Sequence, residues 1–170
     1  MMPQKSPKPR QLPLVVTAPL IIAIVLLLIP LLPVLLAAYL FYAIVLQLVI
    51  WLLWCAHGIN VLLITSESPN WHDYIETELA PKLPVSTIQL NWSERKKWKR
   101  FTLPVMAFRL FGGSREFNPM VIVFRPFRWA KTFRLWKAFN EFKHGKPERL
   151  HEIENELFLY VSQAGLTKAS

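Results

Sequence analysis

Residues 12–56, LPLVVTAPLIIAIVLLLIPLLPVLLAAYLFYAIVLQLVIWLLWCA, decide the structural class of this protein. The chain contains no Asp, Glu, Lys or Arg from Gln11 to Ser66. A helix that spans a bilayer needs about 20 apolar residues, so the stretch is long enough for two such helices. The sequence therefore predicts a membrane-embedded segment over residues 12–56, between a basic tail over residues 1–11 and a separate domain over residues 57–170.

Two prolines divide the apolar stretch. Pro30 and Pro33 lie between two candidate helices, Leu14–Ile29 and Val34–Trp54. Proline removes a backbone donor and clashes with the preceding turn, so it favours a break. No Gly, Asn, Asp or Ser lies near the two prolines, so we expect the turn to stay in or near the hydrocarbon. This pattern predicts an apolar helical hairpin, fully spanning or re-entrant, and a single span is the alternative.

Charge lies on both sides of the apolar stretch. Residues 1–11 carry three cations and no acid, a net charge of +3, and residues 57–170 carry 17 cations and 11 anions, a net charge of +6, which gives +9 in total. Basic segments next to membrane helices stay on the cytoplasmic side. A hairpin would therefore leave the N-terminus and the C-terminal domain in the cytoplasm, whereas a single span would separate them.

The sequence predicts no cofactor and no metal site. Cys55 is the only cysteine, which excludes an intramolecular disulfide, and the four histidines lack the paired spacing of zinc ligands. No Gly-rich fingerprint, nucleophile elbow or carboxylate pair is present. His72, in the first turn of a predicted helix, is a candidate catalytic residue, and a surface or capping role is the alternative.

Residues 57–170 alternate between predicted strands and helices. Short apolar runs predict buried strands at residues 60–65, 85–90 and 120–124. Helical patterns follow at residues 68–79, 104–112, 127–142 and 148–163. Such alternation favours a parallel sheet with right-handed crossovers. The predicted fold class is therefore membrane-anchored α/β, a helical hairpin followed by a small three-stranded parallel, half-Rossmann-like domain.

Polar residues follow each predicted strand. Ligands bind beyond the carboxyl ends of parallel strands, so we expect these residues to meet at one edge of the sheet. Serines at helix starts together with arginines suit a phosphate-bearing ligand, such as a nucleotide, a nucleotide-sugar or a lipid phosphate, and ordinary helix caps are the alternative. The candidate ligand-binding residues are Ser66, Ser68, Asn91, Ser93, Arg95, Arg125 and Arg128.

Aromatic and basic residues alternate after the third predicted strand. On a helix, the aromatic residues fall on one side and the cations on the other, which is typical of a helix in a lipid interface. The neighbouring basic run over residues 95–100 would add attraction to anionic head groups. An aromatic core with a solvated basic face is the alternative, and nucleic acid is an unlikely partner because no binding motif is present. The candidate membrane-surface residues are Trp129, Lys131, Phe133, Arg134, Trp136 and Lys137.

Four strings resemble a group of bacterial membrane-anchored proteins with no established activity: SESPNW at 66–71, LNWSER at 90–95, FGGSREFNP at 111–119 and FKHG at 142–145. The resemblance implies a bacterial inner-membrane setting. Two hypotheses for function follow. The first is a membrane-anchored cytoplasmic module that binds membrane lipids, a protein partner or a second copy of itself. The second is an enzyme or binding domain for a phosphate-bearing small molecule.

Overall fold

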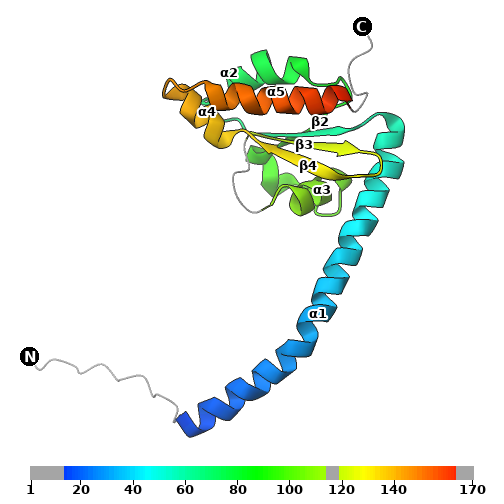
Figure 1. Ribbon diagram of the computed structural model, residues 1–170, viewed down its shortest axis with the longest axis vertical. Coiled ribbons are helices and arrows are strands. Elements are labelled where there is room, and N and C mark those ends of the chain that lie inside the picture. Colours follow the sequence, from blue (N-terminus) through cyan, green and yellow to red (C-terminus); the bar gives the residue numbers. More distant parts are fainter. Residues whose placement is uncertain (1–13, 114–118, 164–170) are drawn as a thin grey trace, which may run out of the picture. The chain divides into compact units, whose positions relative to one another are not determined.

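The computed structural model describes residues 14–113 and 119–163 (Figure 1). The chain divides into two compact units, residues 1–42 and residues 43–170. Residues 14–42 of helix α1 (Leu14–Leu53) form the described part of the first unit. Residues 43–53 of the same helix belong to the second unit. A short 3-10 helix, η1 (Cys55–His57), follows it.

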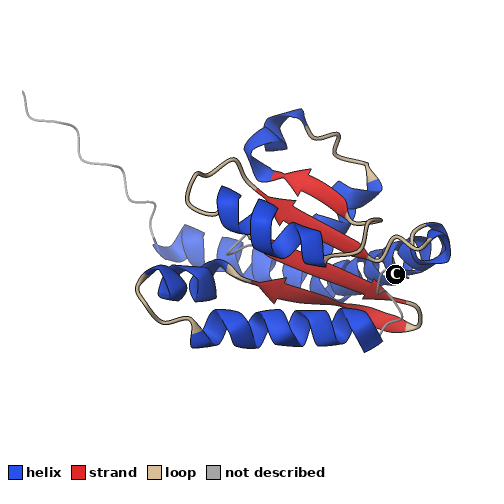
Figure 2. Ribbon diagram, turned by 90° about the horizontal axis from the view of Figure 1, so that it is seen from above, coloured by secondary structure: helices blue, strands red, loops and turns tan. Residues whose placement is uncertain are grey.

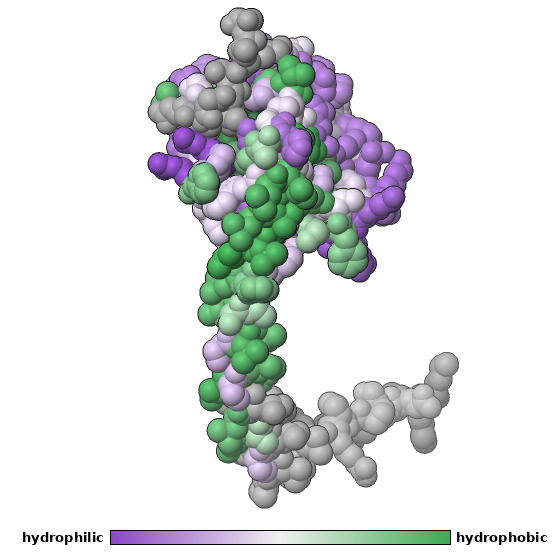
Figure 3. All heavy atoms as spheres, turned by 90° about the vertical axis from the view of Figure 1, so that its right-hand side faces the viewer, coloured by the Kyte–Doolittle hydropathy of each residue, from purple (hydrophilic) through white to green (hydrophobic). Residues whose placement is uncertain are grey.

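Helix α1 is continuous, so the predicted hairpin is wrong. Its 40 residues include Pro19, Pro30 and Pro33 without a break. Each proline removes a single hydrogen bond, whereas an open loop in hydrocarbon would leave several backbone groups unpaired, so one long helix is the better solution. Among the described residues, the segment Leu28–His57 is long and apolar enough to cross a membrane, judged by length and composition. Apolar side chains cover most of the visible face of α1 (Figure 3).

The second unit contains a mixed sheet of four strands, in the order β2-β1-β3-β4. Strand β1 (Val61–Thr65) pairs in parallel with β2 (Ile88–Asn91), which confirms the parallel pairing of the first two predicted strands. Strand β3 (Met120–Arg125) runs antiparallel to β1, and β4 (Arg128–Arg134) runs antiparallel to β3. The prediction of three parallel strands is therefore wrong in both the number of strands and the direction of the third.

A tight hairpin explains this error. The sequence predicts a helix from residue 127, but Pro126 and Phe127 form the turn between β3 and β4. Proline fixes the backbone at one turn position, and Phe127 adopts a left-handed conformation with φ of 59° at the next. The chain therefore reverses and continues as a strand, and a shorter helix, α4 (Trp136–Lys143), begins only after it.

Helices cover both faces of the sheet, as the two ribbon views show (Figures 1 and 2). One face packs against α2 (His72–Tyr74), the π-helical turn η2 (Ile75–Leu79), α4 and α5 (Glu148–Gln163). The other face packs against α3 (Leu103–Phe111) and the last turns of α1. Strands β1 and β3 are central and fully covered, which explains why their sequences are continuous apolar runs.

Candidate functional site

Polar side chains meet where β1 and β2 end. Thr65 lies opposite Asn91, so the segments that follow these parallel strands leave the sheet side by side. The backbone N–H of Glu67 donates to Ser93 Oγ at 3.1 Å, and Asn91 Nδ2 donates to Glu67 Oε1 at 2.9 Å. Asn91 Oδ1 accepts from the backbone N–H of Ser93 at 2.9 Å and so caps the 3-10 helix η4 (Trp92–Lys97). These bonds tie the two segments together.

The two predicted serines of the first segment have different surroundings. Ser66 Oγ accepts a hydrogen bond from Trp71 Nε1 at 3.3 Å. The backbone carbonyl of Ser68 accepts from the N–H groups of Trp71 and His72, at 3.3 and 3.2 Å. The helix predicted to begin at Ser68 begins instead at His72, without a side-chain cap. No serine-capped helix start therefore faces this edge from the first segment.

An open pocket of about 270 Å³ lies between the ends of β1 and β2 and the helical turns α2 and η2. Three carboxylates line it, those of Glu67, Glu76 and Glu94, together with the imidazole of His72. No Lys or Arg is among its lining residues, although Glu94 Oε1 forms an ion pair with Lys97 Nζ at 2.8 Å. A phosphate would meet like charge here, whereas a cationic group would be attracted, so the pocket suits an amine or a guanidinium.

None of the predicted arginines lines this pocket. Arg95 Nη1 donates to the carbonyl of Trp92 at 3.3 Å, and its guanidinium stacks on the Trp92 ring at 5.1 Å from the centroid. Because β3 is antiparallel to β1, Arg125 and Arg128 lie at the opposite end of the sheet, beyond the start of β1. Arg125 stacks over the ring of Tyr160 at 4.8 Å. The prediction that all three polar clusters converge on one edge is therefore wrong.

The predicted membrane-surface residues do not share a helical face, because most of them belong to β4. Phe133 is buried in the core, and Lys131 Nζ forms an ion pair with Glu156 at 2.7 Å. Arg134 Nη2 donates to the carbonyl of Gly112 at 2.8 Å. Trp129 packs on Phe111, while Trp136 and Lys137 begin α4. Alternation along a strand sends these side chains to both faces of the sheet.

A different aromatic and basic surface lies at the β3–β4 turn. The side chain of Phe127 is 89 % exposed, and its ring lies 5.7 Å from that of Trp51 on α1. Nearby on α1, Gln47 is buried, and its Nε2 donates to the carbonyl of Arg128 at 3.5 Å. The turn therefore packs against the last turns of α1 while its phenylalanine side chain remains exposed.

A second exposed phenylalanine precedes α3. Phe101 is 90 % exposed, and it directly follows Lys99 and Arg100. Leu103, two residues later, packs in the core cluster that also contains the last turns of α1. Both exposed phenylalanines thus belong to the α1 and α3 side of the sheet. The signal in the sequence is a phenylalanine beside arginine or lysine, RPFR and KRF. Sequence reasoning singled out the cations of both strings but not Phe101 or Phe127.

The described residues show no metal-binding arrangement. Within residues 14–113 and 119–163, no group of three or more His, Cys, Asp or Glu side chains could hold a metal ion. In comparisons with known proteins, no family model, no curated protein and no solved structure matches this chain.

Proposed function

We propose that this protein is a membrane-anchored α/β module of the bacterial inner membrane, whose folded unit rests on an anionic lipid surface and catalyses no reaction itself. The observation that carries the proposal is the pair of almost fully exposed phenylalanines, Phe101 and Phe127, each flanked by cations. Isolated apolar residues at a surface are ordinary, but Phe127 contacts Trp51 of α1 and Phe101 directly precedes α3, and α1 and α3 pack on the same face of the sheet.

The last turns of α1 support a lipid contact. On the side that packs against the sheet, Leu46 and Ile50 are buried. On the other side, Leu48 and Leu52 are 45 % and 70 % exposed. A helix that is apolar all round needs an apolar environment on every side. Lipid would supply that environment for the side that the sheet does not cover.

The cations around the phenylalanines fit anionic head groups. Arg128 directly follows Phe127 of the β3–β4 turn, and Lys99 and Arg100 precede Phe101. The turn carries no acid, and neither do residues 95–101. Each cation near an anionic surface contributes about 1 kcal/mol of attraction. Phenylalanine in the interface with cations at the head groups is the usual arrangement for a protein that lies on a membrane.

A phosphate-bearing small molecule is less well supported at the β1–β2 edge. The pocket there is lined by three carboxylates, and Arg125 and Arg128 lie at the other end of the sheet. A lipid phosphate remains compatible with the proposal, because the exposed Arg128 beside Phe127 would meet it at the membrane surface.

The single helix changes the expected orientation. Residues 14–42 of α1 would extend about 43 Å, more than the roughly 30 Å of a hydrocarbon core. Lys5, Lys8 and Arg10 precede the helix, whereas residues 57–81 contain no Lys or Arg. Cations close to the ends of a span determine its orientation. We therefore propose that the N-terminus is cytoplasmic and that the α/β unit lies on the opposite side of the inner membrane.

A depth measurement tests the lipid contact. Full-length protein carrying Cys55→Ala and one new cysteine, Phe127→Cys or Phe101→Cys, is labelled with a fluorophore and reconstituted in vesicles of phosphatidylglycerol and phosphatidylcholine. Nitroxide-labelled lipids should quench both positions strongly. Phe142→Cys is the matched control, because Phe142 is an exposed phenylalanine of α4, which packs on the other face of the sheet. Equal quenching at all three positions, or none at 101 and 127, would contradict the proposal.

A further inference from the structure

The two edges of the sheet differ in their chemistry. Strand β4 forms one edge and carries Arg128, Lys131 and Arg134, and its pairing with β3 contains an irregularity. Charged side chains and bulges at an edge prevent pairing with other chains. Strand β2 forms the other edge, and it reads Ile-Gln-Leu-Asn without a charge. Among the described strands β2 pairs with β1 alone, so its outer backbone groups face away from the sheet.

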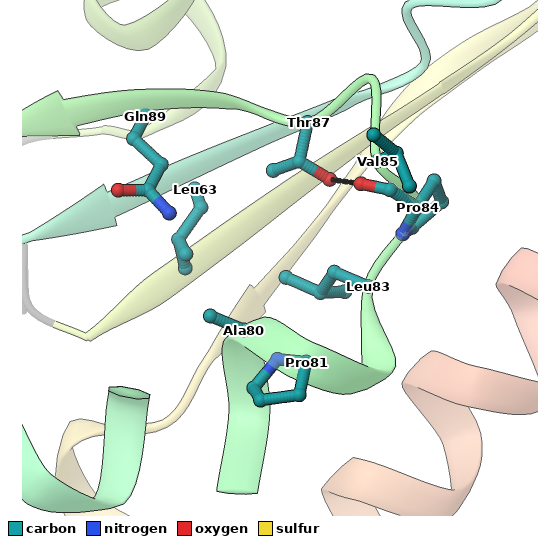
Figure 4. Close-up of a pocket in the computed structure, with 8 residues that line it drawn as sticks. All are labelled: Leu63, Ala80, Pro81, Leu83, Pro84, Val85, Thr87 and Gln89. Atoms are coloured by element: carbon teal, nitrogen blue, oxygen red, sulfur yellow. Dashed lines mark hydrogen bonds between the residues drawn. The ribbon is translucent and has the colours of Figure 1, made fainter. Parts of the chain in front are cut away.

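Two pockets lie in series along β2, on the side that faces the helical turns. The first has a volume of about 190 Å³ and lies between β2 and the 3-10 helix η3 (Ala80–Lys82). Figure 4 shows that Leu63, Ala80 and Leu83 give it an apolar wall. The second is the acidic pocket at the ends of β1 and β2. Gln89 lines both pockets, so they are neighbours along the strand.

The spacing of the pockets matches an extended chain. Thr87 and Gln89 line the first pocket, and Gln89 and Asn91 line the second. Side chains two residues apart in a strand point to the same face, about 6.6 Å from one another. A strand added beside β2 would therefore place two such side chains over the two pockets.

We infer that the outer edge of β2 is a docking site for an extended peptide segment with an apolar side chain and, two residues away, a lysine or arginine. The backbone of the segment would pair with β2, as in other cases of strand addition. Its apolar side chain would enter the pocket beside Ala80 and Leu83. Its cation would enter the acidic pocket, where Glu67 and Glu76 supply complementary charge beside the Glu94–Lys97 ion pair. This inference is independent of the lipid contact, which involves the opposite face of the sheet.

Defined peptides test the inference on the full-length protein in detergent. Two capped heptapeptides, Thr-Thr-Val-Thr-Lys-Thr-Thr and Thr-Thr-Lys-Thr-Val-Thr-Thr, cover addition parallel and antiparallel to β2. Binding is measured by fluorescence anisotropy, and hydrogen exchange at residues 88–91 reports on backbone pairing. We expect one of the two peptides to bind and to slow exchange in β2. Replacement of its lysine by glutamate should abolish binding.

Two variants of the helical turn η2 test whether the peptide lysine binds in the acidic pocket. Glu76→Gln removes a charge from the acidic pocket and should weaken binding by about two- to fivefold, the range for an exposed ion pair. Glu78→Gln is the control, because Glu78 pairs with Lys82 and does not line that pocket. Absence of binding by both peptides would overturn the inference. So would binding that is equally strong in both variants and the wild type, or that leaves exchange at residues 88–91 unchanged.

Discussion

The ring of Phe127 lies 5.7 Å from the ring of Trp51, measured between centroids, and thereby joins the β3–β4 turn to the end of α1. Phe127 is the only non-glycine residue with positive φ among the described residues, at 59°. A bulky residue in this conformation costs about 1–3 kcal/mol, and such strain is often retained where a side chain has a function. The contact with Trp51 covers little of the phenylalanine, which is 89 % exposed. We therefore attribute the retained strain to the proposed lipid contact.

Phe127→Gly should relieve the backbone strain at this turn but still weaken the lipid contact. Glycine adopts positive φ without strain, so the variant should be more stable than Phe127→Ala by about 1 kcal/mol, since both lose the ring and alanine alone keeps the Cβ. Thermal unfolding of the full-length protein in detergent, followed by tryptophan fluorescence, measures the difference. Both variants should weaken the lipid contact, seen as reduced quenching of a label at Phe101→Cys. An alanine variant as stable as the glycine variant would show that the turn is not strained.

Tyr74 links α2 to α5 and predicts a loss of stability at high pH. Its hydroxyl donates to Glu154 Oε1, and burial followed by this bond raises the pKa of Tyr74 well above its usual value of 10. Above pH 10 the unfolded chain releases the tyrosine proton while the folded chain retains it, so the contribution of Tyr74 to the free energy of unfolding should be constant below pH 10 and fall above it. Denaturant titrations between pH 8 and about 11 measure this trend.

Tyr74→Phe should remove the Tyr74 contribution to this pH dependence. The variant also loses the hydrogen bond to Glu154, which predicts about 1–2 kcal/mol lower stability at neutral pH. Tyr160→Phe is a suitable comparison, because Tyr160 contacts Phe133 through its ring. If Tyr74→Phe kept the full decrease in stability above pH 10, another group would be responsible for it.

Two glycines should respond differently to substitution by alanine. A Cβ on Gly112 would lie 2.5 Å from the carbonyl oxygen of Phe108 and 2.8 Å from its ring, although the backbone of Gly112 has an ordinary helical φ of −71°. Gly58 has φ of 73°, but nothing lies within 4 Å of its added Cβ. Gly112→Ala should therefore cost about 2–3 kcal/mol through overpacking, and Gly58→Ala about 1 kcal/mol through backbone strain. Thermal unfolding of both variants gives the order, and a reversed order would contradict the packing around α3.

Local signals were sufficient for some elements and not for others. The final helix was predicted at residues 148–163, as observed, because its apolar face and flanking Gly and Pro residues mark it clearly. Strand β4 was missed because Trp129 and Phe133, four residues apart, fit a helix as well as they fit a strand. Only the left-handed turn at Phe127 decides between them, and a phenylalanine gives no local sign of such a conformation.

The same limit applies to the candidate site, because local sequence signals predicted only part of it. Ser66, Asn91 and Ser93 were predicted to lie together, and they do, because the pairing of β1 and β2 is parallel. Arg125 and Arg128 lie at the other end, because the direction of β3 depends on its partners in the sheet rather than on its own residues. The acidic pocket was not predicted, because Glu76 reaches it from a π-helical turn whose register cannot be read from the sequence.

The orientation of α1 in the membrane can be tested with reporters fused to the C-terminus. If the helix crosses the membrane once, the tail with Lys5, Lys8 and Arg10 should stay in the cytoplasm, and a reporter fused after Ser170 should be active only outside it. Alkaline phosphatase, which needs an oxidising compartment for its disulfides, and a cytoplasm-dependent fluorescent protein form a matched pair of reporters. Replacement of all three cations by glutamine should reduce the outside signal, because the bias at the start of the helix is removed. A cytoplasmic C-terminus in the wild type would instead require two crossings, none, or one crossing in the reverse orientation, and would contradict the proposed orientation.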